Sequence, residues 1–461
     1  MISSSVKSPT LEDREVEAFR SALRGELLRP GDPGYDDARR VWNAMVDKRP
    51  ALIARCTGLE DVAAAVRFGR ERGLLISIRG GGHNVAGMAV AEGGLMIDCA
   101  PMKGIAVDPA GRTARAGAGV LWGEFDAVTQ EYGLATVGGV VSTTGVAGLT
   151  LGGGQGWLTG KHGLSLDNLL AAEVVTADGE MVRASAEEHP DLFWALRGAG
   201  ANFGVVTSFE YRLHPVGPTV LGGMVIHPLP KAREVLRFYR EFAAGQPDEL
   251  TTYAALLTAP DGNPVVAMVC CYAGPPEEGE KAVEPLRRFG PPVADLIGPM
   301  PYVAVQGIIS QAFPHGRLNY WKSTLLREIP DGVINALADF AGRVPSPHSA
   351  IAIADTHGAY GRVAPDATAY AHRDLPFDLV ILSSWTDPAD SERNVAWTRG
   401  LYEAVRPFAP AGVYVNDLDG DEGQARVRDA YGVNYARLAE LKKTWDPDNV
   451  FRANHNIAPA G

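Results

Sequence analysis

Residues 138–156 read GGVVSTTGVAGLTLGGGQG, and eight of these 19 residues are glycine. Apolar residues fill much of the remainder, whereas a flexible linker would be polar. We therefore expect buried backbone that packs against something flat or extended. Ser142, Thr143 and Thr144 add hydroxyl groups that can bind a phosphate or the heteroatoms of a ring.

A second glycine-rich segment, residues 79–84 (RGGGHN), follows a predicted strand at residues 74–78. Three consecutive glycines let several N–H groups point into one concavity, which suits a diphosphate. No Gly-Lys-Ser/Thr follows, so this is not a Walker loop, and the spacing is not that of a Rossmann fingerprint. Alone, the segment is equally well explained as a tight turn with a surface histidine. Two such segments about sixty residues apart favour one large shared ligand.

The composition is that of a globular protein with ample core material: 461 residues, 46% hydrophobic and 21% charged. The 43 Lys and Arg residues against 55 Asp and Glu give a net charge of −12, which argues against binding to nucleic acid or anionic membranes. The four cysteines form no CxxC pair and the ten histidines no HxH or HExxH pattern, so we expect no disulfide framework and no metal. The polar residues 1–7 and the lack of a long apolar run predict a cytoplasmic protein.

The texture of the sequence changes at two places, residues 214–218 and 407–412, each marked by proline and glycine. Glycine clusters dominate before the first and vanish after it, which suggests one domain in two chain segments with a second domain inserted between them. Hydrophobic periodicity predicts helices at 11–28, 59–72, 121–131, 191–196, 231–242, 331–340 and 423–443, and strands at 74–78, 95–98, 173–176, 265–269 and 379–382.

Further motifs follow in a recognisable order: GLSLDNL at 163–169, GANFGVVT at 200–207, NYARL at 434–438 and DPDNVF at 446–451. With residues 79–84 and 145–156, they make the chain resemble the berberine-bridge-enzyme-like FAD-linked oxidases of the vanillyl-alcohol oxidase and para-cresol methylhydroxylase (PCMH) superfamily, over residues 35–458. The resemblance implies an α+β fold: a two-segment PCMH-type FAD-binding domain with an inserted α+β substrate domain built on an antiparallel sheet. The implied limits are 1–215 (core about 46–215), 216–410 and 411–461.

The resemblance also implies a covalent bond from His83 to the 8α-methyl group of FAD. Many relatives carry a second link through a cysteine, but Val141 stands at that position, so one link is expected rather than two. The alternative is a non-covalent flavin with His83 as a neighbour. The residues implied to bind FAD are Arg79, Gly80, Gly81, Gly82, His83, Asn84, Gly139, Thr143, Thr144, Gly145, Gly148, Gly153, Gly154, Gly200, Asn202, Gly204, Val205, Tyr435, Asn454 and Asn456.

The implied reaction is hydride transfer from a C–H bond of a small organic substrate, an alcohol, amine or secondary metabolite, to the flavin, with O2 reduced to H2O2. A dehydrogenase with another acceptor and a flavin-retaining binding protein are the alternatives. Tyr435 is the first candidate for the catalytic base, followed by Tyr431 and Asp417. Asp417 stands where relatives have an aromatic residue, and we interpret it as an exposed loop acid. The expected substrate-binding residues are Tyr253, Tyr272, Arg317, Tyr320 and Trp321.

Overall fold

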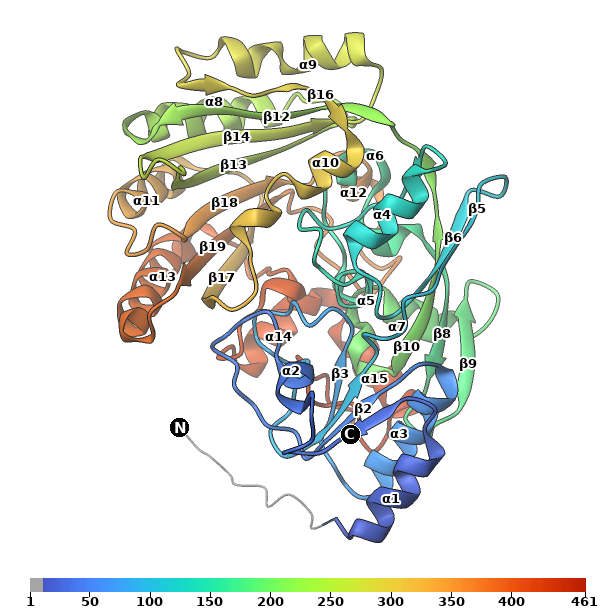
Figure 1. Cartoon of the computed structure of the whole chain (residues 1–461). Helices are drawn as coiled ribbons and strands as arrows, with labels where there is room; N and C mark the ends of the chain where they lie inside the picture. The colour runs from blue at the N-terminus through green and yellow to red at the C-terminus, as the bar shows by residue number, and fades with distance from the viewer. Residues whose placement is uncertain (1–10) are drawn as a thin grey trace.

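The computed structural model describes residues 11–461; the polar stretch 1–7 lies outside the described residues. The chain opens with helix α1 (Asp13–Ala22) and a four-stranded sheet of order β1-β2-β4-β3, drawn in blue in Figure 1. Its strands are β1 (Glu26–Leu28), β2 (Leu52–Arg55), β4 (Leu95–Asp98) and β3 (Ile76–Arg79). The predicted helix 11–28 is therefore too long, because residues 26–28 pair with β2 as an antiparallel strand.

A second sheet of five antiparallel strands has the order β5-β6-β10-β8-β9. The strands are β5 (Ile105–Asp108), β6 (Thr113–Gly117), β10 (Val205–Arg212), β8 (Leu169–Val175) and β9 (Met181–Ser185). Helix α3 (Leu59–Glu71) contacts β4 of the first sheet and both β8 and β10 of the second. Its apolar face thereby joins the two sheets into one hydrophobic core. Helices α4 (Trp122–Gln130), α5 (Val146–Gly152) and α7 (Pro190–Ala199) complete this part.

The inserted part is built on one large antiparallel sheet of order β15-β12-β14-β13-β18-β19-β17, with β16 paired to β12. The strands are β12 (Thr219–Pro228), β13 (Leu250–Thr258), β14 (Pro264–Tyr272), β15 (Ala294–Asp295), β16 (Gly298–Pro301), β17 (Leu318–Leu326), β18 (Ala350–Asp355) and β19 (Phe377–Trp385). Helices α8 (Ala232–Ala243), α9 (Pro276–Arg288), α11 (Asp331–Ala341) and α13 (Ser391–Val405) pack on one face of it (Figure 1). This architecture confirms the predicted fold class.

After α13 the chain returns to the first part through the short helix η7 (Val415–Asp417) and helices α14 (Gln424–Tyr431) and α15 (Tyr435–Trp445). The predicted helix 423–443 is thus two helices, because Gly432 takes a positive φ of 49° between them. Fully buried Lys442 fastens this return: its Nζ donates to the Asn202 carbonyl (2.6 Å) and to Asp446 (2.6 Å). The limits 1–215, 216–410 and 411–461 remain our working division of the chain.

Within residues 11–461, no helix is both long and apolar enough to cross a membrane. The same residues hold no group of three or more His, Cys, Asp or Glu side chains arranged to bind a metal ion.

Candidate functional site

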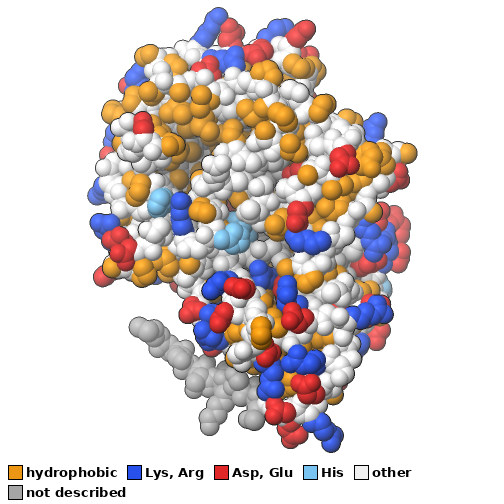
Figure 2. Space-filling view, in the orientation of Figure 1, with side chains coloured by type: hydrophobic (Ala, Val, Ile, Leu, Met, Phe, Trp, Pro, Cys, Tyr) orange, Lys and Arg blue, Asp and Glu red, His pale blue; other side chains and the backbone are white. Residues whose placement is uncertain are grey.

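A cavity of about 500 Å³ separates the bare face of the large sheet from the glycine-rich loops. Three chain regions line it: loops from residues 76–89, 139–157 and 198–202, strands of the inserted sheet, and the return segment between residues 414 and 455. Its volume lies in the usual range for ligand sites. Figure 2 shows hydrophobic side chains gathered over the inserted part of the molecule and charged ones over the lower part.

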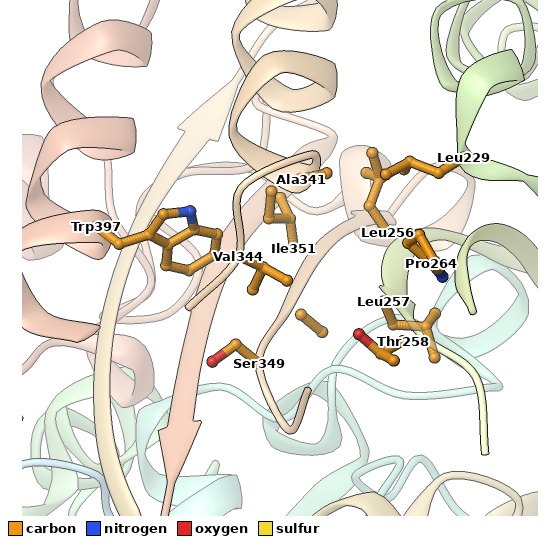
Figure 3. Close-up of a pocket in the computed structure, with 11 residues that line it drawn as sticks. Leu229, Leu256, Leu257, Thr258, Pro264, Ala341, Val344, Ser349, Ile351 and Trp397 are labelled. Carbon is orange, nitrogen blue, oxygen red and sulfur yellow. The ribbon is translucent and has the colours of Figure 1, made fainter. Parts of the chain in front are cut away.

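A second pocket, on the helix-covered side of the same sheet, is far smaller (Figure 3). It has a volume of about 10 Å³ and is walled by Leu229, Ile351, Trp397 and other mostly apolar side chains. Such a space holds about one water molecule. It is a packing gap, and it leaves the large cavity as the candidate site.

The two glycine-rich segments meet backbone to backbone at the cavity wall. A Cβ placed on Gly81 would lie 2.5 Å from the Gly145 nitrogen, and a Cβ on Gly145 would lie 2.5 Å from the Gly81 nitrogen. Neither position therefore tolerates a side chain. Gly148, on α5, differs: it lines the cavity and a Cβ there would have no atom within 4 Å. Here glycine keeps space free for a ligand.

His83 lines the cavity with its side chain partly buried, and its ring stacks on Trp42 with centroids 4.5 Å apart. Burial, together with the nearby His315, lowers the pKa of His83 to about 4, so its imidazole is neutral at physiological pH. Its Nε2 has no hydrogen-bond partner within the described chain. The histidine is thus a neutral nucleophile held against the cavity.

Two carboxyl groups, Asp378 on β19 and Asp417 on η7, also line the cavity. They are close enough for their charges to interact, and two neighbouring buried carboxylates favour retention of a proton by one of them. Burial raises the pKa of both, and the charge of Asp378 raises that of Asp417 further. A proton is therefore retained more readily by this pair, which joins the inserted part to the return segment, than by an exposed carboxyl group.

Our interpretation of Asp417 as an exposed loop acid is wrong, because its side chain lines the cavity beside Asp378. Sequence reasoning missed Asp378 altogether. The signal was present: Asp378 is the one charged residue in the apolar strand sequence FDLVILSSW of β19, and it is only 2% exposed. A buried acid without an obvious partner needs a reason.

Of the predicted FAD-binding residues, twelve line the cavity: Gly80, Gly81, Gly82, His83, Asn84, Gly139, Thr144, Gly145, Gly148, Gly200, Asn202 and Asn454. The others lie outside its lining: Arg79, Thr143, Gly153, Gly154, Gly204, Val205, Tyr435 and Asn456. The Arg79 guanidinium donates to the Ala38 carbonyl, and its Nε lies 3.9 Å from Asp98 Oδ1. These contacts hold the start of the glycine-rich segment 79–84 in place. The Gly154 N–H donates to the Tyr414 hydroxyl (2.8 Å), which fixes the glycine-rich segment 138–156 to the return segment.

The predicted substrate-binding residues do not all lie on the same face of the large sheet. Trp321 and Tyr253 line the cavity. Tyr320, next to Trp321 on β17, points to the other face, since side chains alternate along a strand. There its hydroxyl donates to Asp421 (2.8 Å) and accepts from Arg399 (2.8 Å).

Arg317 and Tyr272 also lie away from the cavity, contrary to expectation. Arg317 donates to the carbonyl of Ala312 (3.2 Å), and the Tyr272 hydroxyl donates to Glu278 (3.5 Å) beside α9. Among the predicted residues, the aromatic part of the cavity wall therefore comes from Trp321 and Tyr253.

The two tyrosines proposed as bases occupy different places. Tyr431 lines the cavity, and burial raises the pKa of its hydroxyl group. Tyr435 does not line the cavity; its ring lies under the guanidinium of Arg428, 5.0 Å from the centroid. Of the three candidates, Asp417 alone lies against both the sheet and the return segment.

A further buried carboxyl group, Asp126 on α4, lies behind the cavity wall. It accepts a hydrogen bond of 2.7 Å from Gln306 of helix α10 (Tyr302–Gly307), and burial raises its pKa to about 7. Gln306 also donates to the Gly139 carbonyl (3.2 Å), so this contact ties the inserted part to the glycine-rich segment 138–156.

Comparisons with known proteins agree along the whole chain. Residues 50–185 match the family described as FAD binding domain, and residues 413–458 match berberine and berberine like. (R)-6-hydroxynicotine oxidase of Paenarthrobacter nicotinovorans is 33% identical over 458 residues, covering 95% of this chain and 98% of the relative. An FAD-linked oxidoreductase of Dictyostelium discoideum is 32% identical over 449 residues, covering 96% and 97%. The crystal structure of 6-hydroxy-D-nicotine oxidase from Arthrobacter nicotinovorans superposes with a TM-score of 0.87 at 32% identity, covering 95% and 98%.

Proposed function

Since this chain belongs to the berberine-bridge-enzyme-like FAD-linked oxidoreductases of the vanillyl-alcohol oxidase and PCMH superfamily, we propose that it oxidises a small organic molecule with O2 as electron acceptor. The substrate loses a hydride from a C–H bond and a proton from a neighbouring hydroxyl or amine group. FAD, when bound, would supply the acceptor for the hydride, and transfer of its two electrons with two protons to O2 would give H2O2. The curated relative with 33% identity is named for the oxidation of a hydroxynicotine.

The cavity fits FAD in two respects. Gly148 leaves open space where any other residue would place a side chain. In addition, several buried polar atoms of the lining have no hydrogen-bond partner within residues 11–461: His83 Nε2, Gln155 Nε2, Asp378 Oδ1, Asn454 Oδ1 and His455 Nε2. Buried polar atoms are almost always paired, so a polar ligand explains this set.

We assign His83 as the single point of covalent attachment. Its neutral imidazole, fixed by stacking on Trp42, presents an unpartnered nitrogen to the cavity. Val141 also lines the cavity and has no nucleophilic atom, and each of the four cysteines is buried outside the lining. One link through His83 is thus the attachment that these side chains allow.

The carboxyl pair supplies proton acceptance. Because one of Asp378 and Asp417 retains a proton, the remaining negative charge can accept the proton of a substrate hydroxyl or amine as the hydride departs. Asp417 is therefore our first candidate for the catalytic base among the predicted residues, ahead of Tyr431 and Tyr435.

The observation that carries this proposal is the alignment of both glycine loops, His83 and the carboxyl pair around one cavity. The test begins with acid precipitation of the purified protein. We expect yellow colour and flavin fluorescence to stay with the pellet, and His83→Ala to release them into the supernatant while some FAD still binds. Flavin in the wild-type supernatant would contradict the covalent link, and failure to bind FAD after reconstitution would contradict the function.

The electron acceptor is tested separately, during turnover with substrates found by screening. An oxidase consumes one O2 and releases one H2O2 per substrate oxidised. Reduction of a dye without peroxide release would instead identify a dehydrogenase.

A further inference from the structure

The face of the large sheet that borders the cavity is unusually poor in side-chain bulk. Five of its lining residues are alanines, on three neighbouring strands: Ala255 on β13, Ala267 on β14, and Ala350, Ala352 and Ala354 on β18. Alternation places the large side chains of these strands, such as Leu256 and Ile351, on the opposite, helix-covered face. The alanines therefore leave room on the cavity side, while the core keeps its volume.

Strand pairing arranges these residues in rows across the sheet. In one row, Ala267 lies opposite Ala255, Ala255 opposite Ala352, and Ala352 opposite Val380. With strands about 4.8 Å apart, the three alanines span roughly 10 Å of wall that carries only methyl groups. Leu257, Leu382, Trp321 and Phe313 extend this apolar surface. A rigid hydrocarbon body can lie against it.

The neighbouring row ends in the polar group of the site. Tyr253 lies opposite Ala354, and Ala354 lies opposite Asp378, which meets Asp417. The two aspartates are the only acidic residues in the cavity lining, and the lining has no lysine or arginine. An anionic substrate would find no cation to pair with and would face the negative charge of the pair. A molecule with many hydroxyl groups would leave most of them unpaired against alanine and leucine.

We infer that the substrate is a bulky, mainly apolar molecule without negative charge, whose single hydroxyl or amine group reaches the Asp378–Asp417 pair while its hydrocarbon body rests on the alanine row. This inference rests on the proposed function and names its substrate class. It separates this chain from an oxidase of oligosaccharides or of carboxylated substrates.

Binding of inert ligands tests the inference without turnover. 1-Adamantanol and 1-adamantanamine are bulky and carry one polar group each. The carbon that bears this group has no hydrogen, so neither compound can give up a hydride from it. Adamantanecarboxylate has the same cage with a negative charge, and cellobiose is a polyhydroxy control. We would titrate each into the flavin-loaded enzyme by calorimetry. The expected result is that the alcohol or the amine binds at least about tenfold more tightly than the carboxylate and cellobiose.

A substitution in the wall shows where the ligand lies. Ala352→Phe fills the end of the alanine row beside Val380, and Ala364→Phe adds the same ring at an exposed loop position of the inserted part. We expect Ala352→Phe to weaken binding of the preferred cage compound by about tenfold or more and Ala364→Phe to leave it unchanged. Ala255→Val, a smaller change in the same row, gives a second reading if Ala352→Phe folds poorly.

Three results would overturn the inference: tighter binding of cellobiose or the carboxylate, equal binding of all four compounds, or insensitivity of the cage compounds to both wall substitutions. If flavin is retained and peroxide is produced while the cage compounds fail to bind, the substrate class is wrong and the oxidase function stands. If the protein binds no flavin, both fail together.

Discussion

Asp126 gives the sharpest prediction about stability, because its carboxyl group is 1% exposed and has one hydrogen bond, from Gln306. Burial raises the pKa of Asp126 from its ordinary 3.8 to about 7. The folded protein therefore holds this proton more tightly than the unfolded chain. Its contribution is present below pH 4 and is lost as the pH rises to 7, which costs about 4 kcal/mol of unfolding free energy over that interval.

Asp126→Asn removes the titrating group and keeps its shape. The stability of the variant relative to wild type should therefore rise by roughly 2 kcal/mol between pH 5 and pH 7. For a chain of 461 residues, this corresponds to a relative increase in Tm of about 2 °C. Both proteins are melted at each pH and followed by circular dichroism.

Thr129→Val on the same helix is the matched control, since Thr129 is fully buried and does not titrate. Its Tm difference from wild type should be the same at both pH values. If the difference for Asp126→Asn were also constant, Asp126 would be hydrated in the folded protein and the reasoning from burial would be refuted.

Gly148→Leu should reduce the flavin absorbance per mole of reconstituted protein. Gly104→Leu should not, because Gly104 also has open space around its Cβ position but lies outside the cavity. An equal loss in both variants would contradict the role of Gly148 in leaving space for FAD. Asp417→Asn should slow anaerobic flavin reduction by substrate about 10²- to 10⁴-fold in stopped-flow measurements at unchanged flavin content, and an unchanged rate would remove it from proton transfer. Lys442→Met should lower the free energy of unfolding in urea by about 3–5 kcal/mol, because it leaves a buried carboxylate unpaired, while the exposed Lys443→Met should have little effect. A small effect of Lys442→Met would show that the pair contributes little.

The parts of the site that depend on backbone geometry could be predicted from the sequence. Glycine-rich segments with apolar neighbours indicate places where two stretches of backbone pack closely together. The backbones at Gly81 and Gly145 do meet in this way at the cavity. Side-chain direction was harder. Tyr320 and Trp321 are adjacent and both aromatic, and the face each occupies depends on which side of the sheet the helices cover.

The carboxyl pair shows a different limit. Asp378 lies in a strand of the inserted part and Asp417 in the return segment, so their proximity depends on how these two parts of the chain pack together. No local pattern encodes that docking. The prediction of a single helix at residues 423–443 was wrong for a local reason. Helical periodicity runs through the segment, but Gly432 with its positive φ divides it into α14 and α15.

Because the chain returns through η7, α14 and α15, part of the cavity wall is synthesised last. Tyr414, Asn416, Asp417 and His455 complete the wall around the cavity, yet they leave the ribosome only after the whole inserted part has been made. Until then, the glycine loops and the alanine face lack the segment that covers them, and the hydrogen bond from Lys442 to the Asn202 carbonyl cannot form. The wall around the cavity is therefore completed late in the synthesis of the chain, and a ribosome that stalls within the inserted part yields a product that lacks this closing wall.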